Sequence, residues 1–295
     1  MSPARGAGTG RFPAPRLLLG GESLLGVSRA PRDRMIEVTT RYQDAETLAV
    51  TLSKALAAGA EGVLVSPSPP FAAALAELKQ SVPIYALLPN VPEYVRDSSD
   101  LGLVGAAMKR VKRASPLTLA RLGITGLTHS LAVLRSDFSG LVPLLLELEA
   151  AALAAKDLRG VVLAAPLTDL ALAGSHRAFF EHYCRFVRGR FRAAAGFETH
   201  NLGHLLSRLR AWGIQPDLVV GPVNMRGLLM KPSPEELLAE LRRGDVPVLA
   251  KEVRAAGAVP LVEGARYALA HGAHGVVADL VDLEDLTTEL RALSA

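Results

Sequence analysis

The chain has 295 residues, of which 49% are hydrophobic, 21% are charged and only 5% are aromatic. This composition indicates a globular core of alanine, leucine and valine, and it excludes a disordered chain. The formal net charge of +4 is modest, and Cys184 as the single cysteine excludes an internal disulfide and a metal site of several thiolates.

The amino-terminal residues 1–15 contain Gly, Ala, Pro and Arg without the apolar core of a secretory signal, so we expect a disordered arm. No uninterrupted apolar stretch is long enough to span a membrane. The run 141–155, which is rich in leucine and alanine, is interrupted by Glu147 and Glu149, and this favours a buried or amphipathic helix. We therefore predict a cytoplasmic protein without a membrane partner, in which residues 16–295 form one domain.

A repeated unit recurs along the chain, in which a helix-like stretch meets a glycine-containing turn and then a short apolar run. The clear copies are 59–65 and 272–278, and 156–163 and 213–220 are looser. Glycine after a helix can take the left-handed conformation that ends it, and an apolar run without polar alternation suits a strand covered on both faces. Repetition of this unit is typical of a parallel α/β protein.

The predicted elements follow in chain order. The apolar runs 17–20 and 24–27 predict a first strand or a small hairpin, and Asp44 is the expected cap of the first helix. Further strands are predicted at 62–66, 82–88, 160–165, 193–198, 218–223, 246–251 and 275–279. Helices are predicted at 44–58, 71–79, 177–187, 202–212, 262–271, and from 233 and 284 onward. Within the segment 91–155, residues 123–128 form either a strand or a turn between helices.

Nine candidate strands compete for the eight positions of a (β/α)8 barrel. Either the first runs form an accessory cover or 123–128 is not a strand. A doubly wound open sheet is the alternative, but such a sheet usually has a glycine-rich phosphate loop after its first strand, and Gly-Gly-Glu-Ser at 20–23 is a poor match. We predict an α/β fold, a (β/α)8 TIM barrel with an irregular amino-terminal arm.

Polar residues gather where the predicted strands end, and these ends carry the chemistry of such barrels. They are Ser66, Asn90, Thr168, Asp169, Glu198, Thr199, His200, Asn201, Asn224, Arg226, Lys251, Glu252 and Asp279. Their density predicts a polar pocket. Asp169, Asn201 and Asp279 also suit helix caps.

The run Gly-Phe-Glu-Thr-His-Asn at 196–201 precedes Asp-Leu-Val-Val at 217–220, Pro-Val-Leu-Ala-Lys at 247–251 and Arg-Tyr-Ala-Leu-Ala-His at 266–271. In this order and spacing, residues 196–286 resemble the carboxyl-terminal third of the aldo-keto reductase superfamily. The resemblance implies a barrel fold and, in working members, NADPH-dependent reduction of carbonyl compounds.

Several residues that the resemblance would assign to the reductase are replaced. Glu198 stands where the family holds the nicotinamide amide with a serine, and Val223 stands where an aromatic ring stacks on the nicotinamide. The family's tyrosine acid has no counterpart after Ser66, and only His129 could supply the histidine of the fourth strand. We therefore expect the family fold without its reductase tetrad. The cofactor stays undetermined, with NADPH as one option.

Lys251 predicts a different chemistry. A desolvated lysine at a strand end can lose its proton and form a Schiff base with a carbonyl compound, while Glu198 or Glu252 moves protons. An ion pair between Lys251 and either glutamate is the simpler interpretation. A metal site of Glu198, His200 and His204 matches no common ligand spacing, so we predict no metal.

The sequence thus predicts an enzyme, of the lyase (aldolase) type or a divergent oxidoreductase, acting on a small polar carbonyl compound. The predicted catalytic residues are Lys251, Glu198 and Glu252, and the predicted substrate-binding residues are Thr199, His200, Asn224, Arg226, Ser66 and Asn90. A barrel that binds a ligand without catalysis is the alternative. The basic run 185–192 is interpreted as a solvated helix face, so no nucleic-acid partner is predicted.

Overall fold

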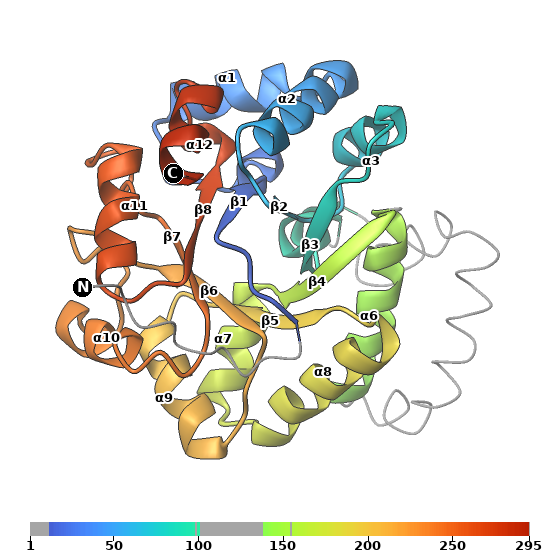
Figure 1. Ribbon diagram of the computed structural model, residues 1–295. Helices are drawn as coiled ribbons and strands as arrows, with labels where there is room; N and C mark the ends of the chain where they lie inside the picture. Colours follow the sequence, from blue (N-terminus) through green and yellow to red (C-terminus); the bar gives the residue numbers. More distant parts are fainter. Residues whose placement is uncertain (1–11, 98, 101–137, 154, 295) are drawn as a thin grey trace.

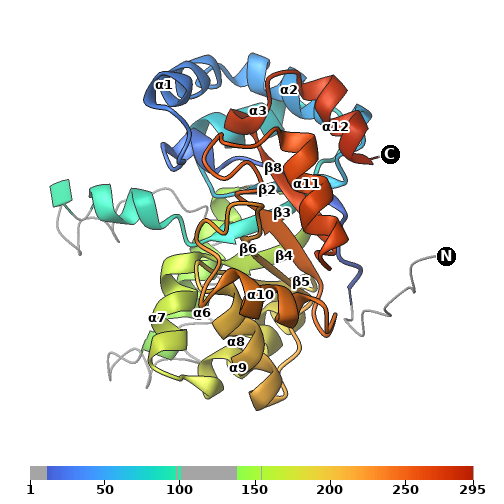
Figure 2. The same ribbon diagram turned by 90° about the vertical axis from the view of Figure 1, so that its left-hand side faces the viewer.

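The computed structural model describes residues 12–97, 99–100, 138–153 and 155–294. In these residues eight parallel strands close into a barrel whose strand order follows the chain (Figures 1 and 2). The strands are β1 (Leu17–Gly20), β2 (Gly62–Val65), β3 (Pro83–Leu88), β4 (Asp157–Leu163), β5 (Ala194–Glu198), β6 (Leu218–Pro222), β7 (Val248–Lys251) and β8 (Gly275–Asp279). Pairing of β1 with β8 closes the barrel, which confirms the predicted fold class.

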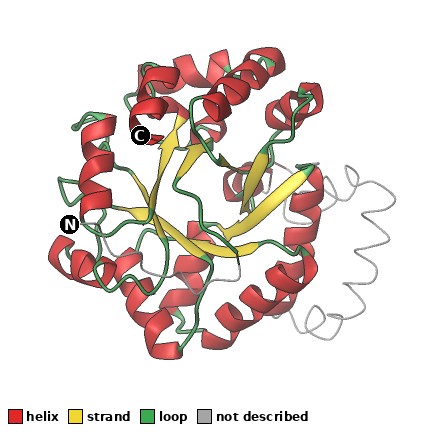
Figure 3. Cartoon of the chain, in the orientation of Figure 1, coloured by secondary structure: helices red, strands yellow, loops and turns green. Residues whose placement is uncertain are grey.

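Helices surround the strands on the outside of the barrel (Figure 3). They are α1 (Arg32–Arg41), α2 (Ala45–Ala57), α3 (Pro69–Glu77), α6 (Phe138–Ala152), α7 (Ala165–Ala173), α8 (Arg177–Arg190), α9 (Leu202–Trp212), α10 (Pro234–Leu241), α11 (Leu261–Ala270) and α12 (Leu286–Ser294). Two 3-10 turns, η1 (Glu22–Leu25) and η2 (Leu280–Asp282), follow β1 and β8. None of the described helices is long and apolar enough to cross a bilayer.

The strands are buried on both faces, as their uninterrupted apolar sequences predict. Every residue of β1, β2, β5 and β6 is buried. Successive side chains of β1 point to opposite faces, so Leu18 joins the interior of the barrel while Leu17 and Leu19 join the layer beneath the helices. The two apolar layers hold the strand ends in fixed positions around the barrel mouth.

Most predicted elements are present, with two corrections. The second apolar run forms η1 and not the second strand of a hairpin, because the chain turns at Gly26 in the left-handed conformation with φ 75°. Helices α1 and α7 are additional to the predicted elements. The uncertain segment 123–128 and His129 lie outside the described residues, and β3 pairs directly with β4.

The segment before β1 runs across the barrel end at which the strands begin (Figures 1 and 2). Phe12 and Ala14 pack against the interior residues of the strands, and His274 Nε2 lies 3.1 Å from the carbonyl oxygen of Ala14. The described segment before β1 therefore covers this end of the barrel. The remainder of the predicted arm, residues 1–11, lies outside the described residues.

Helix α6 confirms the prediction of a buried or amphipathic helix, and its carboxylates bind neighbouring groups. Glu147 forms an ion pair with Arg190 of α8 at 2.8 Å, and Glu149 accepts a hydrogen bond from the backbone N–H of Asn90 at 3.0 Å. Arg190 belongs to the basic run 185–192, in which Arg188 also forms an ion pair, with the fully buried Asp217 at 2.8 Å. Two arginines of this run thus serve contacts within the barrel wall.

Candidate functional site

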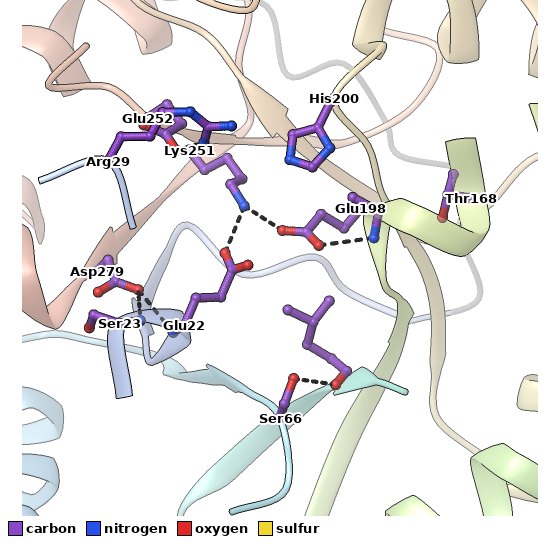
Figure 4. A network of polar contacts seen from close by, with 12 residues as sticks. Glu22, Ser23, Arg29, Ser66, Thr168, Glu198, His200, Lys251, Glu252 and Asp279 are labelled. Carbon is purple, nitrogen blue, oxygen red and sulfur yellow. Dashed lines mark hydrogen bonds and ion pairs between the residues drawn. The ribbon is translucent and has the colours of Figure 1, made fainter. Parts of the chain in front are cut away.

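One lysine and two glutamates meet at the carboxyl ends of β1, β5 and β7 (Figure 4). The Nζ atom of Lys251 lies 2.6 Å from Glu22 Oε2 and 2.5 Å from Glu198 Oε1. The side chains of Lys251, Glu198 and Glu22 are only 12%, 3% and 21% exposed. These three residues, called the Lys251 cluster below, therefore form a buried charge network and not a surface ion pair.

The three groups of the cluster differ in how their surroundings act on ionisation. Burial opposes the charge of Lys251, but Glu198 and Glu22 outweigh it and raise the pKa of this lysine above its usual value. Burial also opposes ionisation of Glu198, yet Lys251 and the backbone N–H of Ala165 lower its pKa. Lys251 is therefore an ammonium and Glu198 a carboxylate at neutral pH.

Glu22 is the member of the cluster that changes charge near neutrality. Burial, and next the negative charge of Glu198, raise the pKa of Glu22 to about 7, although Lys251 acts in the opposite direction. Two carboxylates share one ammonium, so the second carboxylate retains a proton more readily than an ordinary glutamate. Carboxyl groups tuned in this way are typical of acid–base catalysts.

Glu22 reaches the cluster because a tight turn follows β1. Asp279, the last residue of β8, accepts the backbone N–H groups of Glu22 and Ser23 with Oδ2, at 3.0 and 3.4 Å. Its Oδ1 caps η2 by accepting the N–H of Val281 at 3.2 Å. A Cβ atom on Gly21 would lie 2.7 Å from a methyl group of Val65, so the close approach of this turn to β2 favours glycine.

A small cavity of about 40 Å³ adjoins the cluster. Its lining includes Lys251 and Glu22 together with Asp279, Arg29 and Glu252. Arg29 and Glu252 form an ion pair of 2.7 Å at its side. This volume is enough for water molecules or one small polar group.

Glu252, one of the three predicted catalytic residues, lies beside the cavity but does not belong to the cluster. Its backbone has a φ of 56°, in the left-handed region, and its carboxylate is the partner of Arg29. Among the described residues, the ion-pair partners of Lys251 are Glu22 and Glu198. The ion pair of Lys251 with Glu198 is therefore present, whereas the one with Glu252 is replaced by an unexpected contact with Glu22.

The chain after β5 places Thr199 and His200 against α7. The hydroxyl of the fully buried Thr199 donates a hydrogen bond to Asp169 Oδ1, and the backbone N–H of His200 donates to Asp169 Oδ2 at 3.1 Å. The ring of His200 is 40% exposed, and Figure 4 shows it beside the Glu198–Lys251 pair. Asp169 thus fixes the two residues that follow Glu198, although it lies inside α7 and not at a helix cap.

Three other predicted binding residues use their side chains to bind backbone groups of the chain. The hydroxyl of Ser66 donates to the carbonyl oxygen of Leu87 at 2.7 Å, and the amide of Asn90 donates to the carbonyl oxygen of Pro67 at 2.7 Å. The side chain of Asn224 closes the turn 224–228. These contacts hold the backbone at the carboxyl ends of the strands. A role of the three residues in substrate binding stays a prediction.

Two further predicted residues lie apart from the cluster. Arg226 is exposed on the loop after β6. Thr168 is fully buried, and its hydroxyl donates to the carbonyl oxygen of Leu163 at 3.2 Å. Neither contacts the cluster through a described hydrogen bond or ion pair, so substrate binding by Arg226 also stays a prediction.

The residues that the family resemblance would assign to a nicotinamide do not fit one. The carboxylate of Glu198 is occupied by Lys251 and Ala165, and the hydroxyl of Thr199 is bound to Asp169. Val223 is fully buried and offers no surface for stacking. The described residues contain no group of three His, Cys, Asp or Glu side chains placed to hold a metal ion.

Comparison with known proteins concerns the barrel alone. No model of a known protein family matches the chain, and no curated protein matches its sequence. The apo form of Gox0644 is 11% identical with a TM-score of 0.49, over 94% of this chain and 88% of that one. An aldo/keto reductase from Brucella melitensis is 12% identical with a TM-score of 0.44, over 94% and 86%. Both similarities are weak, so the fold assignment rests on the closed order of the strands.

Proposed function

We propose that this protein is an enzyme that transfers protons on a small polar carbonyl compound bound at the Lys251 cluster. The observation that carries the proposal is the buried ammonium of Lys251 between two carboxylates, of which Glu22 has its pKa raised to about 7. A buried network with more carboxylates than ammonium groups gains little stability from its ion pairs. Its position at the carboxyl ends of barrel strands is where enzymes of this architecture hold their catalytic groups.

Each member of the cluster has a distinct role in this reaction. The carbonyl oxygen of the substrate binds beside the Nζ atom of Lys251, whose positive charge stabilises the negative charge that develops on that oxygen. When a C–H bond next to the carbonyl breaks, its electron pair moves toward the oxygen and its proton is taken by a base. Glu22 supplies a proton to the oxygen or to the neighbouring carbon. Glu198 remains charged and keeps Lys251 protonated and oriented.

Schiff-base chemistry, the other role predicted for Lys251, starts from a less favourable state. The amine must first lose its proton, and both neighbouring carboxylates oppose this loss. Glu22, at 2.6 Å, is the group positioned to accept that proton before the nitrogen attacks the carbonyl carbon and the oxygen leaves as water. Borohydride treatment with keto acids and aldehydes should leave Lys251 without a mass increase. A reduced adduct on Lys251 would replace our proposal with imine catalysis.

The direct test is exchange of carbon-bound protons in heavy water. Small hydroxyaldehydes, hydroxyketones and keto acids are incubated with the protein in D2O, and the signals of the protons next to the carbonyl are followed by proton NMR. We expect at least one compound to lose these signals with the unaltered chain, and the loss to be strongly slowed by Glu22→Gln. The control Lys54→Met alters an exposed lysine of α2 and should exchange normally.

Two outcomes would contradict the proposal. If the proton signals of a compound broaden but those next to its carbonyl group do not disappear, the compound binds without exchange. This would indicate a barrel that binds its ligand without catalysis. Exchange that persists at the same rate in Glu22→Gln would remove Glu22 from proton transfer. A cytoplasmic location stays a prediction of the sequence and plays no part in this test.

A further inference from the structure

His200 stands next to the Lys251 cluster but has no part in its ion pairs. It follows Glu198 by two residues, in the bend after β5, and Figure 4 shows its ring beside the Glu198 side chain. The side chain of Glu198 is 3% exposed, whereas that of His200 is 40% exposed. His200 contributes to the lowered pKa of Glu198, which agrees with the closeness of the two groups in Figure 4. The site therefore has an imidazole on its solvent side.

Asp169 determines how this imidazole is oriented. Its Oδ2 lies 3.4 Å from His200 Nδ1 and accepts the backbone N–H of the same residue at 3.1 Å. The other carboxylate oxygen accepts the hydroxyl of Thr199. A main-chain and a side-chain contact to one oxygen fix the ring with Nδ1 toward α7 and Nε2 away from it.

The charge of Asp169 also selects the tautomer of the ring. Burial opposes ionisation of Asp169, but hydrogen bonds from His200 and Thr199 outweigh it and lower its pKa. An ionised carboxylate can only accept hydrogen bonds, so the ring nitrogen that faces it must carry a hydrogen. In neutral His200 this leaves Nε2 unprotonated and able to accept a proton.

We infer that Asp169 is a positioning residue that holds His200 in the tautomer with a free Nε2, and that His200 is the second proton-transfer group of the site. The catalytic part of this inference rests on the proposed function. The C–H bond of the bound carbonyl compound breaks, its electron pair moves to the oxygen beside the Lys251 ammonium, and its proton passes to His200 Nε2. Glu22, which approaches Lys251 from the other side in Figure 4, returns a proton.

Two proton-transfer groups around one cation specify the class of reaction. One group removes a proton from carbon while the other delivers a proton elsewhere on the same molecule, so no oxidant or reductant is required. The reaction is a proton shift within a small carbonyl compound, or an elimination next to its carbonyl group. The charged groups that face His200 are Asp169 from α7, which lies 3.4 Å from its Nδ1, and Glu198 from β5 and Lys251 from β7, which lie beside its ring in Figure 4.

The tautomer can be measured without any substrate. Histidine is labelled with ¹⁵N, and long-range couplings to the ring protons distinguish the protonated nitrogen from the unprotonated one above neutral pH. His200→Gln identifies the signals of His200 by their loss. We expect the Nδ1–H tautomer in the unaltered chain. In Asp169→Ala the acceptor that faces Nδ1 is removed, so the ring should shift from the Nδ1–H tautomer toward Nε2–H.

His274 provides an internal control for folding in this experiment. It lies beyond the opposite end of β8, with Nε2 at 3.1 Å from the carbonyl oxygen of Ala14, and its signals should not change in Asp169→Ala. An Nε2–H tautomer of His200 in the unaltered chain would overturn the inference. So would an unchanged tautomer in an Asp169→Ala protein whose His274 signals show that it is folded. Either result leaves the exchange test of Glu22 unaffected, so the two failures are distinguishable.

Discussion

Lys251 carries the only positive charge of its cluster, and removing it isolates two mostly buried carboxylates. Truncation of one partner in a buried ion network costs about 3–5 kcal/mol. We expect Lys251→Met to lower the free energy of unfolding by this amount in a urea titration. The exposed control Lys54→Met should change it by less than about 0.5 kcal/mol. If Lys251→Met lowers the free energy of unfolding by less than about 1 kcal/mol, water already screens the charges of the cluster.

Glu22 predicts a pH dependence of stability with a defined sign. Its pKa rises from 4.5 in the unfolded chain to about 7 in the folded protein, so the folded state binds more protons between these values. This contribution to stability is complete below pH 4.5 and is lost as the pH rises through about 7.

The variant Glu22→Gln lacks this titration. Relative to the unaltered chain, its free energy of unfolding should therefore increase with pH across that window, by on the order of 2 kcal/mol. Chemical denaturation of both proteins at several pH values measures this difference. If the free energies of unfolding of the two proteins change with pH in parallel between pH 4.5 and 7, Glu22 has an ordinary pKa.

At the scale of elements, the loop after β6 depends on one buried amide. Asn224 Oδ1 accepts the backbone N–H groups of Arg226 and Leu228 at 3.2 and 2.9 Å, and its Nδ2 donates to the carbonyl oxygen of Leu228 at 2.9 Å. Asn224→Ala should therefore destabilise the protein by about 2 kcal/mol, because backbone groups of a partly buried turn lose their partners. The neighbouring and 42% exposed Met225, changed to Ala, is the matched control. If thermal unfolding of the two variants coincides, this turn does not depend on Asn224.

Local signals explain why some elements were predicted closely and others were not. Helix α9 and strand β8 begin and end where glycines and apolar runs indicated, since those signals lie within a few residues of each boundary. Helix α7 starts directly after β4, and its first residues have no side-chain cap to mark them. The sequence therefore showed Asp169 as a strand-end residue, whereas it projects from a helix onto Thr199.

The composition of the site was predictable only in part, for a related reason. Lys251 and Glu198 end apolar strands, a pattern that is visible in the sequence. Glu22 contacts Lys251 across 229 positions of the chain, and its own turn has the appearance of an imperfect phosphate loop. A carboxylate directly after the first strand was the one available signal. The side chains of Ser66 and Asn90 showed the opposite problem, because only the fold reveals that each binds a backbone carbonyl group of a neighbouring strand or loop.

On the scale of the whole molecule, the amino-terminal segment covers the end of the barrel at which the strands begin. Phe12 packs against the interior residues at the covered end, so the amino-terminal segment contributes to the core. We expect Phe12→Ala to cost on the order of 1 kcal/mol, since the ring is only partly buried. Pro13→Ala, at the exposed neighbouring residue, should be nearly neutral in the same thermal unfolding experiment. Equal effects of both variants would show that the segment only rests on the surface.

The charge states within the Lys251 cluster determine what the site can do, and NMR can titrate them residue by residue. With ¹³C-labelled glutamate and ¹⁵N-labelled lysine, Glu22→Gln and Lys251→Arg identify the two signals by their loss. We predict that the Glu22 carboxyl titrates with a pKa of about 7 while Lys251 keeps its ammonium protons through the neutral range. Titration of Glu22 near 4.5, or loss of the Lys251 proton at neutral pH, would contradict the proposed site.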